Sequence, residues 1–208
     1  MLLNRILTNK DREDLKPLIE KMFEWCPETM SRKIAEANVQ QAFALEYIMK
    51  LLAFGGDMSA LCVGSFEDTT SESLVAQGHD IVNIDPLENV DLATFRKSTD
   101  EKFDIIFSVS VIEHVFDDEE FIDDICNLLS EKGIAVLTCD FKNSYKAGDP
   151  LPATDVRFFT KVDLEERLPA ILKKNGCSLF GESNWETEPN FIYQGHHYSF
   201  ATFVFTKD

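Results

Sequence analysis

The sequence is poor in positive charge. It holds 20 Lys and Arg residues against 37 Asp and Glu residues, so its formal net charge is −17 at pH 7. Nucleic-acid phosphates and anionic membrane surfaces are bound by clusters of Lys and Arg, which are not evident in this chain. The composition therefore argues against a nucleic-acid or membrane partner. An acidic surface that aids solubility accounts for the charge.

Cysteine patterns typical of disulfide frameworks and zinc sites are lacking. The five cysteines are an odd number and show no C-x-x-C spacing. Cys62 and Cys139 lie inside apolar runs, where a free thiol behaves as a small buried hydrophobe. The sequence therefore predicts free thiols in a reducing compartment and no metal site.

Long hydrophobic runs are lacking as well. The N-terminal stretch MLLNRILTNKDRED has only a short apolar part, which charges follow at once. That part is too short for a signal peptide, and no segment approaches the roughly 20 apolar residues of a membrane-spanning helix. These absences predict a cytoplasmic protein.

Residues 1–57 read as an N-terminal helical extension. Apolar residues recur at helical spacing over 11–30 and again over 31–53, which predicts two helices packed on one flank of the molecule; a lid over a substrate is an alternative. The Gly55-Gly56-Asp57 sequence then breaks the pattern. We place the start of a second part, residues 58–208, after this break.

Within residues 58–208 the patterns of strands and helices alternate. Strands are predicted at 60–63, in HDIVNID, in FDIIFSV and in GIAVLTCDF, and helices at 70–77, from Asp117 and at 161–174. Thr69 and Glu72 have the spacing of a capping box. Two last strands are expected at 177–183 and 197–206, the final one antiparallel and at or near the sheet edge. This order predicts an α/β fold with a mostly parallel sheet, which binds ligands at the carboxyl ends of its strands.

The turn after the first of these strands has little glycine. Its sequence is Val-Gly-Ser-Phe-Glu-Asp from Val63, whereas a dinucleotide site would carry three glycines. Phe66 stands where the second glycine would lie, and two carboxylates follow, which disfavours a pyrophosphate. The turn suits a positively charged ligand without phosphate, such as S-adenosylmethionine.

Asp85 ends the next strand, 21 residues after Gly64. An acidic side chain at about this distance is placed to bind ribose hydroxyls. A tight turn and a helix cap explain the same residues equally well.

With FDIIFSVSVIEHV added, the chain resembles class I S-adenosylmethionine-dependent methyltransferases over roughly residues 58–206. It is most similar to the bacterial small-molecule branch, whose fourth strand ends in a Glu-His pair. The resemblance implies a Rossmann-like seven-stranded sheet of order 3-2-1-4-5-7-6 with an antiparallel last strand. It also implies that the first turn holds the methionine part of S-adenosylmethionine, that Asp85 holds the ribose, and that the segment from Ser110 to His114 lies beside the transferred methyl. The implied cofactor residues are Gly64, Ser65, Phe66, Glu67, Asp85, Pro86, Ser110 and Val111.

The chain departs from this family between Asp85 and Phe103. Only 17 residues separate the two, so the family's second helix and third strand do not both fit at normal length. The adenine pocket is normally built partly there. The residues available for it are Pro86, Leu87, Asp91 and Leu92.

Methyl transfer is an in-line displacement that depends largely on positioning, although a hydroxyl acceptor also needs a base. His114 and Glu113 are the candidate catalytic residues. His114 is the candidate base, with a cap or cofactor-orienting role as the alternative, and Glu113 binds the cofactor or anchors the loop. Asp140, Tyr145 and Arg157 are the acceptor-binding candidates, although a surface salt bridge is the commoner role for an arginine. We expect a small-molecule or glycan-related acceptor, methylated at oxygen. The sequence leaves the oligomeric state open.

Two other functions fit parts of the sequence. The first is a nicotinamide-dependent oxidoreductase, against which the single-glycine acidic turn argues. The second is a catalytically silent methyltransferase-fold module that acts through a partner, which the shortened 86–102 segment keeps open.

Overall fold

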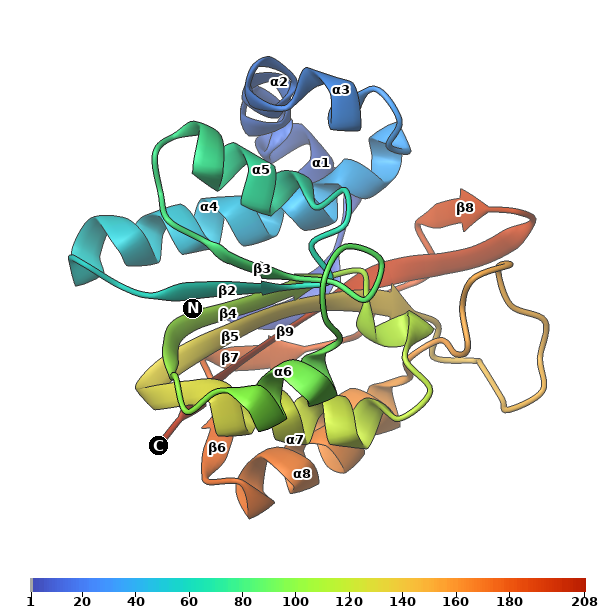
Figure 1. Cartoon of the computed structure of the whole chain (residues 1–208). Coiled ribbons are helices and arrows are strands. Elements are labelled where there is room, and N and C mark those ends of the chain that lie inside the picture. Colours follow the sequence, from blue (N-terminus) through green and yellow to red (C-terminus); the bar gives the residue numbers. More distant parts are fainter. Residues whose placement is uncertain (1) are drawn as a thin grey trace.

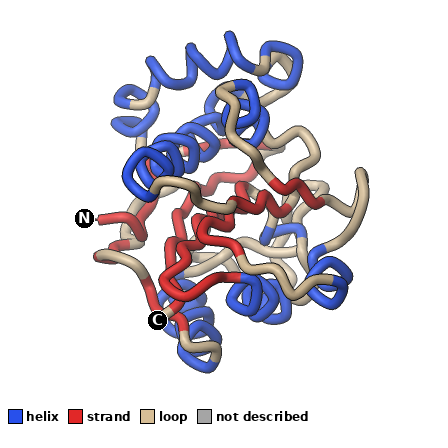
Figure 2. The backbone as a smooth tube through the Cα atoms, turned by 60° about the vertical axis from the view of Figure 1, so that its left-hand side comes forward, coloured by secondary structure: helices blue, strands red, loops and turns tan. Residues whose placement is uncertain are grey.

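A mixed β-sheet runs through the middle of the molecule, and helices cover both of its faces (Figure 1). This computed structural model describes residues 2–208. Figure 2 shows the same layers from another side, with the strands between two groups of helices. Two buried apolar clusters, one on each face of the sheet, hold the layers together. The strands within this range are β1 (Leu2–Leu7), β2 (Ala60–Val63), β3 (Val82–Ile84), β4 (Phe103–Val109), β5 (Leu129–Phe141), β6 (Cys177–Leu179), β7 (Glu182–Asn184), β8 (Phe191–Tyr193) and β9 (His196–Lys207).

The helices divide between the two faces. One side carries the N-terminal helices and α5, and the other carries α6, α7 and α8 (Figure 1). A π-helical stretch at Asp163–Arg167 leads directly into α8, in agreement with the helix predicted over 161–174. The bounds are α1 (Asn9–Asp14), α2 (Lys16–Trp25), α3 (Pro27–Met30), α4 (Asn38–Gly55), α5 (Thr69–Ala76), α6 (Leu92–Ser98), α7 (Asp118–Leu128) and α8 (Leu168–Lys174).

The parallel core of the sheet is the predicted one. Strand β2 pairs in parallel with β3 and β4, and β4 pairs in parallel with β5. Strand β9 pairs antiparallel with β5, as the prediction for the last strand requires. The fold is therefore the Rossmann-like α/β methyltransferase fold. Over residues 2–208 no strand forms between β3 and β4, and the short connection holds only α6, so β3 lies at the edge of the sheet.

The other edge of the sheet differs from the prediction. Nine strands take part rather than seven, and the main path runs β3-β2-β4-β5-β9-β1-β7, with β6 and β8 also pairing with β9. Strand β9 therefore does not end the sheet. The reason is β1, which the sequence analysis placed in a helical extension and which pairs antiparallel with β9 and parallel with β7.

A buried asparagine fixes β1 in place. The Asn4 side chain is 0% exposed, its amide donates to the Phe180 carbonyl at 2.9 Å, and its oxygen accepts from the Val204 N–H at 2.6 Å. These two bonds link three segments that are distant in sequence. A polar residue inside LLNRIL hides the strand pattern, which explains why the sequence analysis missed it.

Two local predictions are also corrected. Helix α5 is capped by Asp68 rather than Thr69, because the Asp68 carboxylate accepts the Ser71 N–H at 2.7 Å. The predicted helix over 11–30 is divided into α1, α2 and α3, and the predicted helix over 31–53 begins only at Asn38. Across residues 2–208, none of the helices combines the length and the apolarity needed to cross a bilayer.

Candidate functional site

A cavity of about 810 Å³ opens at the carboxyl ends of β2, β3 and β4. The parallel order of these strands brings their terminal residues to one edge of the sheet, as the fold predicts. The lining joins the first turn, the end of β3 and the segment after β4, which are far apart in sequence. Of the predicted site residues, Gly64, Phe66, Glu67, Asp85, Pro86, Ser110, Val111 and His114 line it.

The first turn requires its single glycine. Gly64 has φ +83°, and a Cβ placed there would lie 2.4 Å from Val111 Cγ2. The N–H groups of Gly64 and Ser65 both donate to the Ile84 carbonyl, at 2.9 and 3.1 Å. The turn is thus bonded to the end of β3 and pressed against the segment after β4. A larger residue at position 64 would separate these parts of the cavity wall.

Asp85 is held by main-chain donors. Its carboxylate accepts the Leu87 N–H at 2.7 Å and the Phe66 N–H at 3.2 Å. A carboxylate has about four lone-pair positions, so two remain for a ligand. Asp85 therefore both anchors the first turn and presents acceptor capacity to the cavity.

Ser65, Phe66 and Glu67 of the first turn lie in different environments. The Phe66 residue is 48% exposed at the cavity wall. Glu67 has a left-handed backbone with φ +55°, and its carboxylate pairs with the Arg32 guanidinium at 2.8 Å. Ser65 lies behind the wall, where its hydroxyl donates to Glu88 at 2.9 Å. The turn therefore offers the cavity a partly exposed aromatic ring and an ion pair.

The N-terminal segment supplies residues that the sequence analysis missed. Gln41 donates to Asp68 at 3.1 Å and accepts from the Thr70 N–H at 2.9 Å, which ties α4 to the start of α5. The Gln40 amide lies 3.4 Å from the Ser110 hydroxyl, and its buried oxygen has no hydrogen-bond partner. Polar residues at the start of an otherwise apolar helix were the available signal. The lining residues from this segment are Arg32, Lys33, Ile34, Ala37, Asn38, Gln40 and Gln41.

A second, apolar cavity of about 220 Å³ adjoins the first, and Pro86, Val111 and Val115 line both. Asp91 and Leu92, two of the adenine candidates, line only the smaller cavity, whereas Leu87 lines only the larger one. The shortened segment before β4 thus still builds a pocket beside the ribose candidate Asp85.

Ser110 and Glu113 form a hydrogen-bonded pair after β4. Ser110 adopts a left-handed backbone with φ +58°, which a residue with a side chain rarely does, and its hydroxyl donates to Glu113 Oε1 at 2.7 Å. Glu113 is fully buried, and burial raises the pKa of its carboxyl to about 7. The pair therefore places a carboxyl that titrates near neutrality just behind the cavity wall.

His114 lies at the wall itself and is paired with the long loop after β5. Its Nδ1 is 3.1 Å from the Thr154 carbonyl oxygen and 3.2 Å from Asp155 Oδ1. The hydrogen bond to Asp155 raises the pKa of the imidazole to about 9, against the opposing effect of burial. The sequence analysis did not predict this contact between the loop and His114.

The three acceptor candidates lie outside the cavity lining. Asp140 is buried, and burial raises the pKa of its carboxyl well above the usual range. Tyr145 packs its ring edge-on against Phe158, with centroids 5.8 Å apart. Arg157 pairs with Asp118 at 2.8 Å and donates to the Val115 and Phe116 carbonyls. The structure does not bring these residues together at the wall, so their role in acceptor binding stays a prediction.

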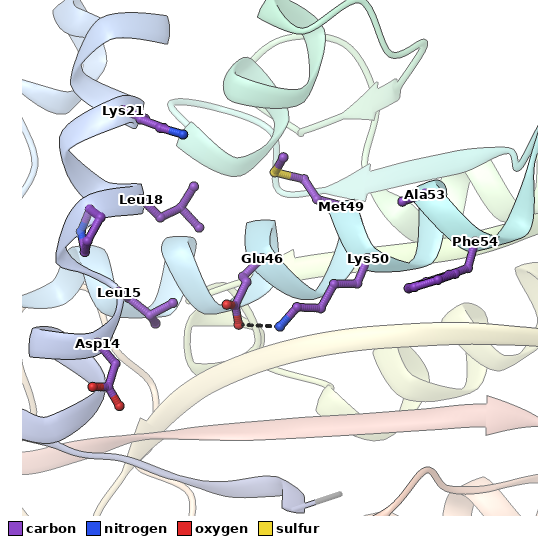
Figure 3. A pocket seen from close by; sticks show the side chains of 10 residues that line it. Asp14, Leu15, Leu18, Lys21, Glu46, Met49, Lys50, Ala53 and Phe54 are labelled. Carbon is purple, nitrogen blue, oxygen red and sulfur yellow. Dashed lines mark ion pairs between the residues drawn. The ribbon is translucent and has the colours of Figure 1, made fainter.

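A separate hollow of about 450 Å³ lies between helices α1, α2 and α4 (Figure 3). Leu15 and Leu18 face Met49 and Phe54 across it, and Lys50 pairs with Glu46 beside it. It shares no lining residue with the 810 Å³ cavity. Among residues 2–208, no group of three or more His, Cys, Asp or Glu side chains is arranged to hold a metal ion.

Comparison with known proteins adds a family match. The model of a family described as a methyltransferase domain matches residues 10–185. No curated protein gives a significant match.

Solved structures are similar in fold at low sequence identity. A 1,6-didemethyltoxoflavin-N1-methyltransferase from Burkholderia thailandensis, solved with its acceptor and S-adenosylhomocysteine, is 15% identical with a TM-score of 0.55, covering 94% of this chain and 90% of that one. Magnesium protoporphyrin IX methyltransferase from Synechocystis PCC 6803 is 12% identical with a TM-score of 0.52, covering 93% and 100%. The [4+2]-cyclase SpnF is 14% identical with a TM-score of 0.55, covering 85% and 84%.

Proposed function

The chain belongs to the methyltransferase domain family as a class I S-adenosylmethionine-dependent enzyme, and on that premise we propose that it methylates a small-molecule acceptor within the 810 Å³ cavity. The observation that carries the proposal is the meeting of three segments at one cavity: the Gly64 turn, the Asp85 strand end and the Ser110–His114 segment. The volume falls within the roughly 300–1,000 Å³ of small-molecule sites.

The residues present suit S-adenosylmethionine. Asp85 offers carboxylate oxygens for ribose hydroxyls, and the Gly64 turn leaves a space that a Cβ would fill. Arg32 and Lys33 offer cations for the methionine carboxylate, and the buried Gln40 oxygen offers an unpaired acceptor for its ammonium. When bound, the cofactor supplies an electrophilic methyl group on a positively charged sulfur. The apolar pocket at Pro86 and Leu92 is the proposed adenine site.

The protein's part in the reaction is to align the acceptor, exclude water and hold its proton. Alignment of two reactants can contribute on the order of 7–11 kcal/mol to lowering a barrier. His114 is the proposed proton acceptor because it is the imidazole on the cavity wall. Glu113, hydrogen-bonded to Ser110, is proposed to hold the segment in place beside the acceptor.

We retain oxygen as the proposed target atom and a glycan-related compound as one proposed acceptor. A hydroxyl is the acceptor for which a base matters most, since its proton leaves as the new bond forms. One structural neighbour is named as an N1-methyltransferase, so nitrogen acceptors belong in any screen. We also retain, as the second candidate, a catalytically silent module that acts through a partner; the cyclase among the structural neighbours illustrates that this fold supports other roles.

Calorimetric titration with S-adenosylmethionine, S-adenosylhomocysteine and NADH tests the cofactor assignment. We expect micromolar binding of the two adenosyl ligands, no binding of NADH, and loss of binding in Asp85→Ala. A screen with methyl-labelled cofactor against hydroxyl and amine acceptors then tests turnover. Absence of adenosyl-ligand binding would contradict the proposal. Binding without turnover on any acceptor would favour the silent module.

A further inference from the structure

Three buried carboxyl groups stand behind His114, and each comes from a different segment. Glu113 lies in the turn after β4, Asp140 at the end of β5, and Asp155 in the long loop that follows β5. Each has one buried oxygen without a hydrogen-bond partner: Glu113 Oε2, Asp140 Oδ1 and Asp155 Oδ2. Buried carboxylates normally have their oxygens paired, so this cluster needs an explanation beyond folding.

The contacts of His114 fix where its exchangeable proton resides. A main-chain carbonyl only accepts hydrogen bonds, so Nδ1, 3.1 Å from the Thr154 oxygen, carries a hydrogen in both charge states. Asp155 Oδ1 lies 3.2 Å from the same nitrogen. The proton that comes and goes is therefore the one on Nε2. The ring lines the cavity and its side chain is 39% exposed, so Nε2 is the nitrogen available to a ligand.

Main-chain bonds hold Asp155 against the imidazole. The Val156 N–H donates to the Glu113 carbonyl at 2.9 Å, and the Phe159 N–H donates to the Asp140 carbonyl at 2.8 Å. These bonds tie the end of the loop to the turn that carries Glu113 and to β5, which carries Asp140. The Asp155 side chain is only 4% exposed, which strengthens its electrostatic effect on His114.

We propose that Asp155 is the positioning residue for His114: it orients the imidazole so that Nε2 faces the cavity and receives the acceptor's proton. This inference rests on the proposed function. As the acceptor oxygen forms its bond to the methyl carbon, its proton moves to Nε2, and the electron pair of the broken carbon–sulfur bond remains on sulfur. His114 is left as an imidazolium, whose charge Asp155 offsets through Nδ1.

The surroundings of His114 are mostly acidic. Glu113 lies on its own turn and Asp155 on the loop, while Asp140 on β5 and Tyr198 on β9 complete the buried cluster. The Lys and Arg residues of the cavity lining are Arg32, which is already paired with Glu67, and Lys33. Outside the lining, Arg157 donates to the carbonyl of the neighbouring Val115. Because the pKa of His114 is raised to about 9, the imidazole is charged at neutral pH in the free protein. The rate of methyl transfer to a neutral hydroxyl should therefore rise as the pH approaches 9, because more of the imidazole is then free to accept the proton.

The test is the titration of His114 by NMR in the full chain, with His114→Gln used to assign its signal among the four histidines. In the unaltered protein we expect a pKa near 9 and a hydrogen on Nδ1 at high pH. In Asp155→Asn the carboxylate is lost, so the pKa should fall by about one unit or more toward 6.5. Asp155→Glu keeps the charge and should restore part of the shift.

Asp149→Asn is the matched control. Asp149 lies in the same loop and accepts the Lys146 N–H at 2.9 Å, outside the cluster. This variant should leave the His114 titration unchanged. Thermal melting and S-adenosylhomocysteine binding establish that each variant is folded, and Asp155→Glu serves where Asp155→Asn does not fold.

Kinetics with any acceptor found separate a positioning role from a structural one. Asp155→Asn should lower the limiting kcat at high pH, where the imidazole is neutral, by about 10- to 100-fold. It should leave the KM for the cofactor nearly unchanged and move the rising limb of the pH profile to lower pH. An unchanged His114 titration, or a hydrogen found on Nε2 rather than Nδ1 at high pH, would overturn the inference. If no acceptor is ever methylated while the titration behaves as expected, the proposed function fails and the Asp155–His114 pairing stands.

Discussion

The cavity has two ends, and they differ in how the carboxylate oxygens beside them are hydrogen-bonded. At the Asp85 end, main-chain N–H groups of Phe66 and Leu87 bond to both oxygens of the acid. At the His114 end, Glu113 and Asp155 each leave a buried oxygen without a partner. The first arrangement fixes geometry, because main-chain donors do not rearrange. The second leaves buried oxygens unpaired, and burial there raises the pKa of Glu113 to about 7.

The comparison indicates how one cavity can serve two tasks. Holding a cofactor requires a rigid set of donors and acceptors, which hydrogen bonds to the main chain provide. Moving a proton requires groups that change charge near the working pH, which burial without full pairing provides. Substitutions at the Asp85 end should weaken cofactor binding. Substitutions at the His114 end should change the pH dependence of the reaction and of stability.

The largest expected effect is at the Asp85 end. Asp85→Ala should weaken S-adenosylmethionine binding by about 100-fold or more, because hydrogen bonds to a charged acceptor contribute roughly 1.5–3 kcal/mol each. Calorimetric titration measures the change. Asp80→Ala is the control, since Asp80 is an exposed acid just before β3. Equal affinities of the Asp85→Ala variant and the unaltered protein would remove Asp85 from the cofactor site.

Gly64→Ala should destabilise the Asp85 end of the cavity, because the added Cβ meets Val111. A left-handed backbone costs a residue with a side chain roughly 1–2 kcal/mol, and forcing Val111 aside costs roughly 1–3 kcal/mol more. The change in the free energy of unfolding, measured with denaturant, gives the sum of the two costs. Gly148→Ala separates the two terms, because Gly148 has φ +95° but nothing within 4 Å of its built Cβ. Similar losses in both variants would mean that the contact with Val111 is unimportant.

Arg157→Ala tests the His114 end, where we expect a loss of stability without a loss of cofactor binding. Removing one partner of a buried ion pair costs roughly 3–5 kcal/mol, and we expect the lower value because Arg167 also pairs with Asp118. Cofactor affinity should not change. Thermal melting and calorimetry together check both statements. Arg157 would regain the acceptor role predicted from sequence if the variant kept its stability and lost only acceptor affinity.

The smallest expected effect is a pH dependence of stability. The pKa of Glu113 is raised to about 7 and that of His114 to about 9, so the folded protein binds protons more tightly than the unfolded chain. Stability should therefore be highest near pH 5 and fall as pH rises to 9, by on the order of 2 kcal/mol. Of these two groups the buried Glu113 contributes more, because solvent screens the partly exposed His114. In Glu113→Gln the fall between pH 5 and 7 should flatten; a curve parallel to that of the unaltered protein would exclude Glu113 as its source.

The sequence predicted the Asp85 end of the cavity better than the His114 end. A glycine after a buried strand and an acid at the end of the next one depend on local geometry, which short motifs encode. Counting residues also predicted that a helix and a strand do not both fit between β3 and β4, and the strand is the one that is missing. The contact of Asp155 with His114 did not, because it depends on how a loop of irregular backbone folds over β4 and β5, and no periodicity encodes such a path.

The same limit explains the errors at the N-terminus. Strand β1 depends on Asn4, whose hydrogen bonds to Phe180 and Val204 exist only in the folded chain, so a polar residue in that stretch argued against a buried strand. Gln40 and Gln41 were overlooked because helix amphipathicity assigns polar residues to solvent, whereas these two are buried against the site.

Strand β1 also has a consequence for the order of folding during synthesis. Asn4 bonds to Val204 across 200 positions of the chain, so β1 leaves the ribosome long before its partner β9. At roughly 5–20 residues per second, β1 waits about 10–40 s for its partner. The β2–β5 core can form earlier, while the LLNRIL segment stays exposed as a potential pairing edge. Chaperone binding or aggregation of nascent chains should therefore be concentrated at the LLNRIL segment until β9 has been synthesised.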